Sequence, residues 1–211
     1  AMTMPDGVRL AAERGRLLQG LPLGEGIMVA IRKDPNEVKA AIRSQDMSSS
    51  VAVAAINGPR NVIISGARDA VNIILSKIGE SGVELNVSHA FHSPLMLPAV
   101  PAFRSIVESM QFAPTTVPLA STVTGDVVGI GAHFEVEHWV QQLSYPVLFK
   151  DALEGALVEG FVLADAATAR THSRRPRHHF FLFVGGERSG GGARRRCNVG
   201  VYSWWRRYWL R

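Results

Sequence analysis

The stretch Ser88-His89-Ala90-Phe91-His92-Ser93-Pro94-Leu95-Met96 lies where a strand-like run gives way to a helix. Residues 83–87 lead into it with alternating apolar and polar side chains. Ser93 and Pro94 then favour a helix start, because serine is a preferred N-cap and proline suits the first helical position. His92 is therefore predicted at a strand-to-helix junction, where a side chain can face a cleft. A single histidine is weak evidence of function, so the flanking sequence has to decide.

Upstream of this stretch, residues 25–88 alternate between strand-like and helix-like runs. Apolar runs at 26–31, 51–56, 62–66 and 83–87 predict four strands. Helices are expected at about 35–43 and 67–79, with Asp34 as N-cap of the first. Asn57-Gly58-Pro59-Arg60-Asn61 is turn chemistry that joins the second and third strands as a hairpin. The order β-α-β-β-α-β predicts a ferredoxin-like unit.

Downstream and upstream of that unit the pattern is that of a second α/β layer. A helix is expected at 6–19, a long helix at 94–110, and shorter helices at 135–143 and 151–159. Strands are expected at 118–123 and 160–163. The fold class is therefore α/β, with the ferredoxin-like unit of residues 25–88 inserted into a larger α/β subdomain made of residues 1–24 and 89–163.

Composition limits the function classes that need to be considered. The chain has 211 residues, 46% of them hydrophobic, which is enough for a core. It has no run of about 18 apolar residues, so no membrane span is expected. One cysteine, Cys197, cannot form an internal disulfide, which fits a reducing, cytoplasmic setting. No cluster with metal-ligand spacing stands out, so no metal is expected.

Residues 164–211 differ from the rest of the chain in composition and charge, and their apolar residues show no periodicity. The net charge of +5 hides an asymmetry: residues 161–211 contain eleven arginines, no lysine and two acidic residues, which leaves −4 for residues 1–160. Three of the four tryptophans also fall there, without periodicity. Three interpretations stay open: a non-native tail read out of frame from a GC-rich gene, a disordered linker, or a basic arm that binds nucleic acid.

Three segments together resemble the acyltransferase domain of type I polyketide synthases. They are RGRLLQ near the start, NGPRNVIISG in the predicted hairpin, and HAFHSPLM after it. The chain is similar, more distantly, to malonyl-CoA:acyl carrier protein transacylases. The resemblance runs from about residue 5 to 163. It implies an acyltransferase fold with a hydrolase-like α/β subdomain, which is partial here, and an acyl transfer through a seryl ester.

The resemblance also implies roles for particular residues. His92 would be the general base, which takes the serine proton and returns it to the leaving thiol. Arg14 would bind the free carboxylate of the malonyl group, because a guanidinium fork binds a carboxylate with two hydrogen bonds. Gln142 would supply a backbone carbonyl that orients the histidine, in place of the Asp of a Ser-His-Asp triad. Without the resemblance, Arg14 would be read as a solvated helix charge.

Three more residues are implied to line the substrate site. Phe91 would exclude the α-methyl group of methylmalonyl donors and so select malonyl, although simple packing is the alternative. His89 is counted with the substrate-binding residues, with a structural role the stronger expectation. Asn57 would lie near the acyl pocket. The implied substrates are malonyl-CoA and a phosphopantetheinyl acyl carrier protein, with no bound cofactor, and the implied partners are the carrier, the ketosynthase and other synthase domains.

The chain departs from the family pattern at its two ends. The nucleophile elbow G-H-S-x-G and an oxyanion-hole G-Q-G segment are expected before residue 1, and Ser44 and Ser48–Ser50 lack elbow context. The closing E-x-G-P-H-P segment is absent after Val162. These departures predict an internal piece that is inactive in isolation. The alternative class is a non-catalytic binding module with a basic tail, but residues 25–88 contain no aromatic residue on which a base could stack.

Overall fold

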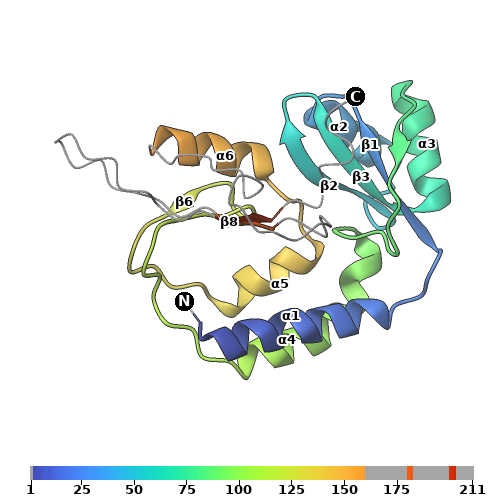
Figure 1. Cartoon of the computed structure of the whole chain (residues 1–211). Helices are drawn as coiled ribbons and strands as arrows, with labels where there is room; N and C mark the ends of the chain where they lie inside the picture. The colour runs from blue at the N-terminus through green and yellow to red at the C-terminus, as the bar shows by residue number, and fades with distance from the viewer. Residues whose placement is uncertain (1, 160–179, 183–199, 203–211) are drawn as a thin grey trace, which may run out of the picture.

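A computed structural model describes residues 2–159, 180–182 and 200–202 of the chain (Figure 1). The strand expected at 160–163 and most of the basic tail lie outside the described residues. Two short strands, β7 and β8, whose residues belong to the tail, pair with each other in antiparallel fashion. The elements are α1 (Met4–Gln19), β1 (Gly26–Ile31), α2 (Pro35–Ser44), β2 (Val51–Gly58), β3 (Asn61–Ala67), α3 (Arg68–Ile78), β4 (Val83–Glu84), the 3₁₀ helix η1 (Pro94–Ala99), α4 (Val100–Glu108), β5 (Leu119–Ala120), β6 (Val127–Val128), α5 (Val136–Ser144), α6 (Phe149–Val158), β7 (Phe180–Leu182) and β8 (Gly200–Tyr202).

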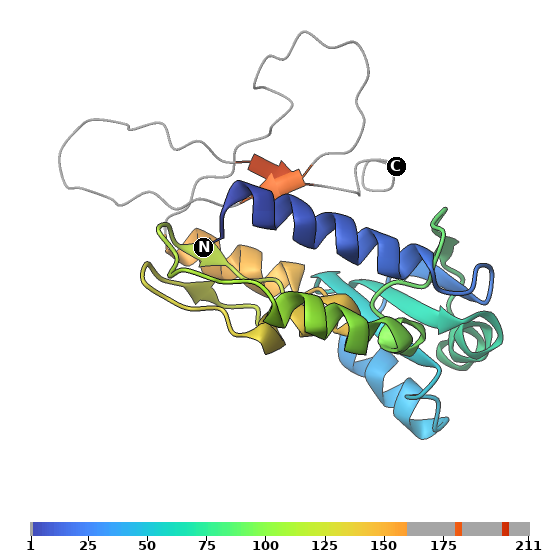
Figure 2. The ribbon, with the colours of Figure 1, turned by 90° about the horizontal axis from the view of Figure 1, so that it is seen from below.

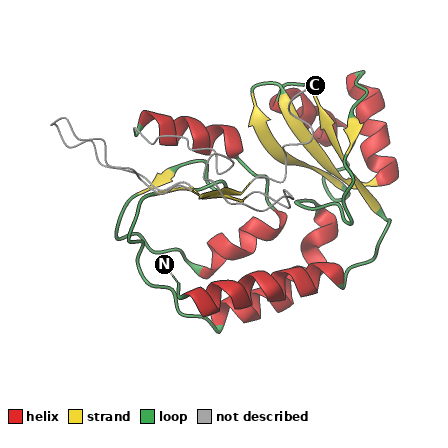
Figure 3. Ribbon diagram, viewed as in Figure 1, coloured by secondary structure: helices red, strands yellow, loops and turns green. Residues whose placement is uncertain are grey.

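A four-stranded antiparallel sheet occupies the first half of the chain, in the order β2-β3-β1-β4 (Figure 3). Its three long strands are rich in valine, isoleucine and alanine, which fit a pleated surface that is buried on both sides. Helices α2 and α3 cover one face. The buried side chains of that layer are Ile27, Val29, Ile31, Val38, Ala41, Ile42, Val51, Val53, Ile56, Val62, Ile64, Ala70, Val71 and Ile74.

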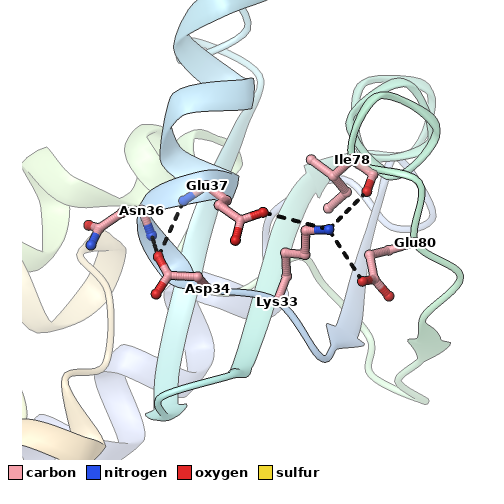
Figure 4. A network of polar contacts seen from close by, with 6 residues as sticks. All are labelled: Lys33, Asp34, Asn36, Glu37, Ile78 and Glu80. Carbon is pink, nitrogen blue, oxygen red and sulfur yellow. Dashed lines mark hydrogen bonds and ion pairs between the residues drawn. The ribbon is translucent and has the colours of Figure 1, made fainter.

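Local signals determine where α2 and α3 begin and end. Asp34 caps α2, because its carboxylate accepts hydrogen bonds from the backbone N–H of Asn36 (2.8 Å) and Glu37 (3.4 Å). Gly79 ends α3 in the left-handed conformation at φ 65°. Lys33 joins the start of α2 to the end of α3. Its Nζ donates to the Ile78 carbonyl (3.3 Å) and lies 3.6 Å from carboxylate oxygens of Glu37 and Glu80 (Figure 4). This network fixes the β1–α2 turn against the end of α3.

The opposite face of the sheet is covered by segments from the second half of the chain. Its buried residues are Met28, Ala54, Ala55, Ile63 and Leu85, and Phe91 and Val147 pack against them. Residue 147 also lies beside the edge strand β2. Its N–H donates to the Ala54 carbonyl, and its carbonyl accepts from Ile56 N–H, both at 2.9 Å, in a parallel pairing. The two halves of the chain are therefore joined by backbone hydrogen bonds as well as by packing.

A helical layer forms the other half of the molecule, where α1 and α4 run side by side in both views (Figures 1 and 2). Helix α5 packs on α4 and η1, and Phe91 and Leu95 contact the same hydrophobic cluster. Helix α6 packs on the β5–β6 hairpin through Ala120, Ala152 and Ala156. The buried members of the helical core are Leu10, Leu18, Met96, Ala99, Phe103, Val107, Met110 and Leu143.

Three expected elements differ in the structure. The long helix expected at 94–110 is a 3₁₀ helix, η1, followed by α4, which ends at Glu108. Pro98 and Pro101 explain this, because neither can donate the backbone hydrogen bond that a continuous α-helix would require. The strand expected at 83–87 is only Val83–Glu84. Beyond it, Leu85 N–H still bonds the Met28 carbonyl at 2.8 Å, and the chain then turns away from β1.

The strand expected at 118–123 is likewise short, because a serine turn ends it. The Ser121 hydroxyl oxygen accepts from the N–H of Val123 (3.2 Å) and Thr124 (3.3 Å), and Gly125 takes φ 84°. The strand is reduced to Leu119–Ala120, paired with β6. The other expected helices begin and end within two residues of their predicted positions. Within the described residues, no helix is long and apolar enough to cross a bilayer.

Candidate functional site

The loop from Ser88 to Ser93 is fixed by its own hydrogen bonds. Phe91 N–H donates to the His89 carbonyl (3.0 Å), and the Ser93 hydroxyl donates to the Ala90 carbonyl (2.6 Å). The same Ser93 oxygen accepts from Leu95 N–H (3.2 Å), which caps η1 as expected. Between these bonds His92 takes φ 56°, a left-handed conformation that is uncommon for residues other than glycine. Such a conformation costs about 1–3 kcal/mol and persists only where its surroundings enforce it.

His92 is held as a neutral imidazole with a defined orientation. Its Nδ1 lies 2.9 Å from the Tyr145 carbonyl oxygen, which can only accept, so Nδ1 carries the proton and Nε2 keeps its lone pair. The pKa of His92 is lowered to about 4: burial is the largest cause, the positive charge of Arg14 acts in the same direction, and the hydrogen bond to the Tyr145 carbonyl opposes the shift. The ring is thus unprotonated at neutral pH and can receive a proton at Nε2.

Arg14 lies on the buried side of α1 and not on its solvated side. It is one helical turn from both Leu10 and Leu18, which are buried against α4 and η1. Its Nε is buried and has no hydrogen-bond partner among the described residues. Burial lowers the pKa of Arg14, although a guanidinium stays protonated in proteins. An arginine that is desolvated without an acidic partner is expected to bind an anionic ligand.

The expected role of Gln142 is wrong in one respect. The carbonyl that holds His92 belongs to Tyr145, three residues further along. Gln142 lies inside α5, whereas Tyr145 has left the helix with φ −82° and ψ 160°. Pro146 follows it, and a residue before proline is driven into extended backbone, which turns the Tyr145 carbonyl away from the helix axis. The dipeptide Tyr145-Pro146 was the signal in the sequence that could have identified this residue.

His89 is buried and both of its ring nitrogens have partners within the protein. Nε2 donates to the Leu21 carbonyl (3.2 Å), which can only accept, and Nδ1 therefore accepts from the Ser88 hydroxyl (3.0 Å). These bonds tie the loop to the segment after α1. His89 thus has a structural role, and its place among the substrate-binding residues finds no support in these contacts.

Phe91 lies in the same loop as His92, whereas Asn57 lies near the end of strand β2. The Phe91 ring is half-buried and contacts both the sheet face and the helical core, with its centroid 5.9 Å from that of His89. Asn57 is 9% exposed and lies near the end of β2. Because Val147 pairs parallel with Ala55, Tyr145 lies two residues before this pair and Asn57 two residues after it. Tyr145 and Asn57 therefore lie on opposite sides of this pair along the strand direction.

The low pKa of His92 predicts a pH-dependent stability. In the unfolded chain a histidine binds a proton near pH 6.5, whereas folded His92 does so only near pH 4. The unfolded state therefore binds more protons between these values, and stability is fully present above pH 6.5 and falls as the pH decreases. We expect the free energy of unfolding in urea to lose about 2 kcal/mol from pH 7.5 to pH 5 through this group.

The matched variant for this measurement is His92→Gln, which should lose that part of the pH dependence. Burial also lowers the pKa of His138, so the wild-type chain contains a second histidine acting in the same direction. That contribution is common to both proteins and cancels in their difference. Equal pH slopes for wild type and His92→Gln would contradict the assignment of a buried neutral ring.

Comparison with known proteins adds family information to this geometry. The family model described as "acyl transferase domain" matches residues 1–168. Polyketide synthase GfsB of Streptomyces halstedii is 39% identical over 164 residues, which are 76% of this chain and 3% of that protein. A type I phenolphthiocerol synthesis polyketide synthase of Mycobacterium marinum is 36% identical over 155 residues, 72% of this chain and 7% of that protein.

Solved structures give the same result for the fold. The acyltransferase domain from the second module of the salinomycin polyketide synthase is 38% identical, with a TM-score of 0.69, over 75% of this chain and 37% of that chain. Malonyl CoA-acyl carrier protein transacylase from Clostridium perfringens is 25% identical, with a TM-score of 0.68, over 76% of this chain and 52% of that chain. The chain therefore spans about a third to a half of the solved structures it matches.

Proposed function

This chain belongs to the acyl transferase domain family, and from that premise we propose that it contributes the base and the carboxylate-binding residue for malonyl transfer in a polyketide synthase. The donor would be malonyl-CoA and the acceptor the phosphopantetheine thiol of an acyl carrier protein. One observation carries the proposal: a neutral histidine, oriented by a backbone carbonyl, shares a site with a half-buried arginine whose buried Nε has no hydrogen-bond partner among the described residues.

The proposed reaction uses the two side-chain groups of this site that can act on a substrate: the Nε2 atom of His92 and the guanidinium of Arg14. A serine hydroxyl attacks the thioester carbonyl of malonyl-CoA while His92 Nε2 takes its proton; the C–S bond then breaks and the proton passes to the CoA sulfur. The carrier thiol next gives its proton to Nε2 and attacks the carbonyl of the seryl ester. The C–O bond to serine then breaks, and Nε2 returns the proton to the serine oxygen, which restores the hydroxyl and the neutral ring. Arg14 binds the distal malonyl carboxylate, and the Tyr145 carbonyl supports the positive charge on the protonated ring.

The reacting serine is proposed to come from outside the described residues. The 211-residue sequence contains no G-x-S-x-G. Ser93, the hydroxyl next to His92 in the sequence, already donates to Ala90 and caps η1. Residues 2–159 are therefore proposed to be incompetent for acyl transfer by themselves.

The organisation proposed for the molecule follows the two layers of the fold. Residues 25–88 are assigned as a ferredoxin-like subdomain, which is supported by the strand order β2-β3-β1-β4 with α2 and α3 on one face. Residues 1–24 and 89–163 are assigned to the large α/β subdomain. Proposed partners are the acyl carrier protein, the ketosynthase and other synthase domains, with no bound cofactor. The assignment of residues 164–211 as a separate tail falls largely outside the described residues.

The test uses a chimera in which residues 2–159 replace the matching residues of the second-module salinomycin acyltransferase domain. We call this protein the acyltransferase chimera. We expect it to transfer the radiolabelled malonyl group from malonyl-CoA to an acyl carrier protein. The label should stay with the carrier protein after unreacted malonyl-CoA is removed. The 211-residue chain alone is the control and should retain no label. An inactive but folded chimera, judged by circular dichroism and thermal unfolding, would contradict the proposed function.

Phe91 is proposed to make the site selective for malonyl over methylmalonyl. Its ring fills the space between the sheet face and the helical core, so an α-methyl group there would meet it. Exclusion of one methyl group is worth about 1–3 kcal/mol, or 10–200-fold. In the acyltransferase chimera, Phe91→Ser should therefore narrow the ratio of kcat/KM for malonyl-CoA to that for methylmalonyl-CoA, without reversing it fully.

The ratio is the correct readout for Phe91, because removing a ring that packs against two clusters also lowers stability. Loss of folded protein reduces both rates equally and leaves the ratio unchanged. Phe112, which stacks on Trp139, provides a matched control: Phe112→Ser should cost stability without changing the ratio. An unchanged ratio in Phe91→Ser would leave Phe91 with a packing role only.

A further inference from the structure

The loop that carries His92 lies against the start of β1 at a position where no side chain fits. A Cβ built on Gly26 would be 2.6 Å from the Cβ of Ala90 and 2.8 Å from the Gly66 carbonyl oxygen. It would also lie 2.6 Å from the Cδ1 of Leu95, which can rotate away. Carbon atoms in contact prefer about 3.5–4.0 Å. Gly26 has no positive φ, so the requirement for glycine here is steric and does not come from backbone conformation.

Ala90 is close enough to His92 in the loop that a displacement of Ala90 would also move the His92 ring. It is 2% exposed, and its carbonyl accepts the 2.6 Å hydrogen bond from Ser93, the residue after His92. The loop therefore closes on both sides of His92, and a shift of Ala90 would move the imidazole with it. Because His92 is already in a left-handed conformation, the loop has little freedom to absorb such a shift locally.

The Tyr145 carbonyl, which accepts the His92 hydrogen bond, is held against the same sheet by a different set of contacts. Val147, two residues after Tyr145, bonds to Ala54 and Ile56 on β2. Strand β2 pairs with β3, and β3 pairs with β1, where Gly26 lies opposite Ala67. Both ends of the 2.9 Å bond are thus positioned by one sheet: the carbonyl by the ladder at β2, and the imidazole by the contact at Gly26.

We infer that Gly26 is a positioning residue for His92: its missing side chain lets Ala90 lie on β1 and thereby sets the distance from His92 Nδ1 to the Tyr145 carbonyl. A methyl group at position 26 displaces the loop but leaves Tyr145 in place, so the hydrogen bond lengthens. The inference rests on the proposed role of His92 as the base, since orientation of its ring matters for chemistry only in that role.

The experiment follows the His92 Nδ1 proton in the 15N-labelled 211-residue chain at pH 7. The resonance is identified by its absence in His92→Gln, and its exchange with water is measured. Gly26→Ala should accelerate this exchange about tenfold or more, because overpacking of this close contact strains the loop that holds the hydrogen bond. Gly129→Ala is the matched control, because its Cβ would meet no atom within 4 Å.

A second variant separates positioning of His92 from simple damage to the sheet. Gly26→Ala combined with Ala90→Gly removes the Cβ–Cβ contact while the contact with Gly66 remains, and should return the exchange toward the wild-type rate. Ala90→Gly alone controls for added loop freedom. An unchanged exchange rate in Gly26→Ala, or a double variant as fast as Gly26→Ala, would overturn the inference. None of these readouts uses acyl transfer, so a failure of the proposed function would be recognised separately.

Discussion

Replacement of His92 by alanine in the acyltransferase chimera is expected to lower kcat/KM by about 10³–10⁴-fold, because a positioned general base contributes up to that factor. The loss should be equal for malonyl-CoA and methylmalonyl-CoA, since the ring acts on the serine and thiol protons and not on the acyl group. Only Nε2 is available for this proton transfer, as Nδ1 is committed to Tyr145. Steady-state kinetics with both donors, and isolation of any labelled seryl ester, provide the measurement.

The control for this result is His133→Ala, which removes an exposed histidine outside the site and should leave kcat/KM unchanged. Thermal unfolding of both variants establishes that a loss of rate is not a loss of fold. If His92→Ala retained turnover within tenfold of the parent chimera, His92 could not be the general base. A loss confined to one donor would instead assign His92 to substrate recognition.

Replacement of Arg14 by leucine is expected to lower kcat/KM for malonyl-CoA by about 10²-fold or more, because two charge-assisted hydrogen bonds to the carboxylate are lost. Arg14→Lys keeps the charge but not the planar fork, so its loss should be smaller, about 10–100-fold. Acetyl-CoA has no distal carboxylate, and its much slower transfer should change little or improve. The ratio of the two donors in each variant is therefore the measurement that identifies the carboxylate contact.

Arg14 has a second, independent readout at His92. The charge of Arg14 is one of the causes that lower the pKa of His92, so Arg14→Leu should raise that pKa while Arg14→Lys should leave it nearly unchanged. NMR titration of the imidazole in the 211-residue chain measures this without any requirement for turnover. Arg16→Leu on the exposed side of α1 is the matched control, since Arg16 pairs with Glu13 at the surface. If Arg16→Leu acted like Arg14→Leu in both assays, helix charge alone would explain the effects.

Much of the first layer could be predicted because its signals are local. The β-branched runs of β1 to β3, the Asp34 cap and the Gly79 stop each depend on neighbours within a few residues. The same is true of Ser93 and Pro94 at the start of η1. The prolines at 98 and 101 were equally local signals, and they explain why the expected long helix is divided. In this chain, most of the element order followed from short-range chemistry. The ends of β4, β5 and α4 were misjudged, η1 was not separated from α4, and β6 was not predicted.

The candidate site was predicted unevenly. His92 and Arg14 were identified through the resemblance of their segments to a family, and nothing in their own spacing required them to meet. The carbonyl partner was assigned to Gln142 and belongs to Tyr145, because the resemblance pointed to the glutamine and the effect of Pro146 on the preceding residue was not used. His89 was counted as substrate-binding, but its bond to the Leu21 carbonyl spans 68 residues of sequence, and a contact of that range leaves no local pattern.

The sequence by itself determined the alternation of strands and helices, the junction at which His92 lies, and the family to which its segments are similar. Tertiary structure alone decided that Arg14 lies beside that junction with a buried Nε that has no partner among the described residues, that Tyr145 holds the His92 ring, and that Gly26 lies under Ala90. The physical reason is range. Propensity, capping and turn chemistry act between neighbours in the chain, whereas desolvation, charge coupling and steric contact act between side chains that only the folded sheet and its covering helices bring together.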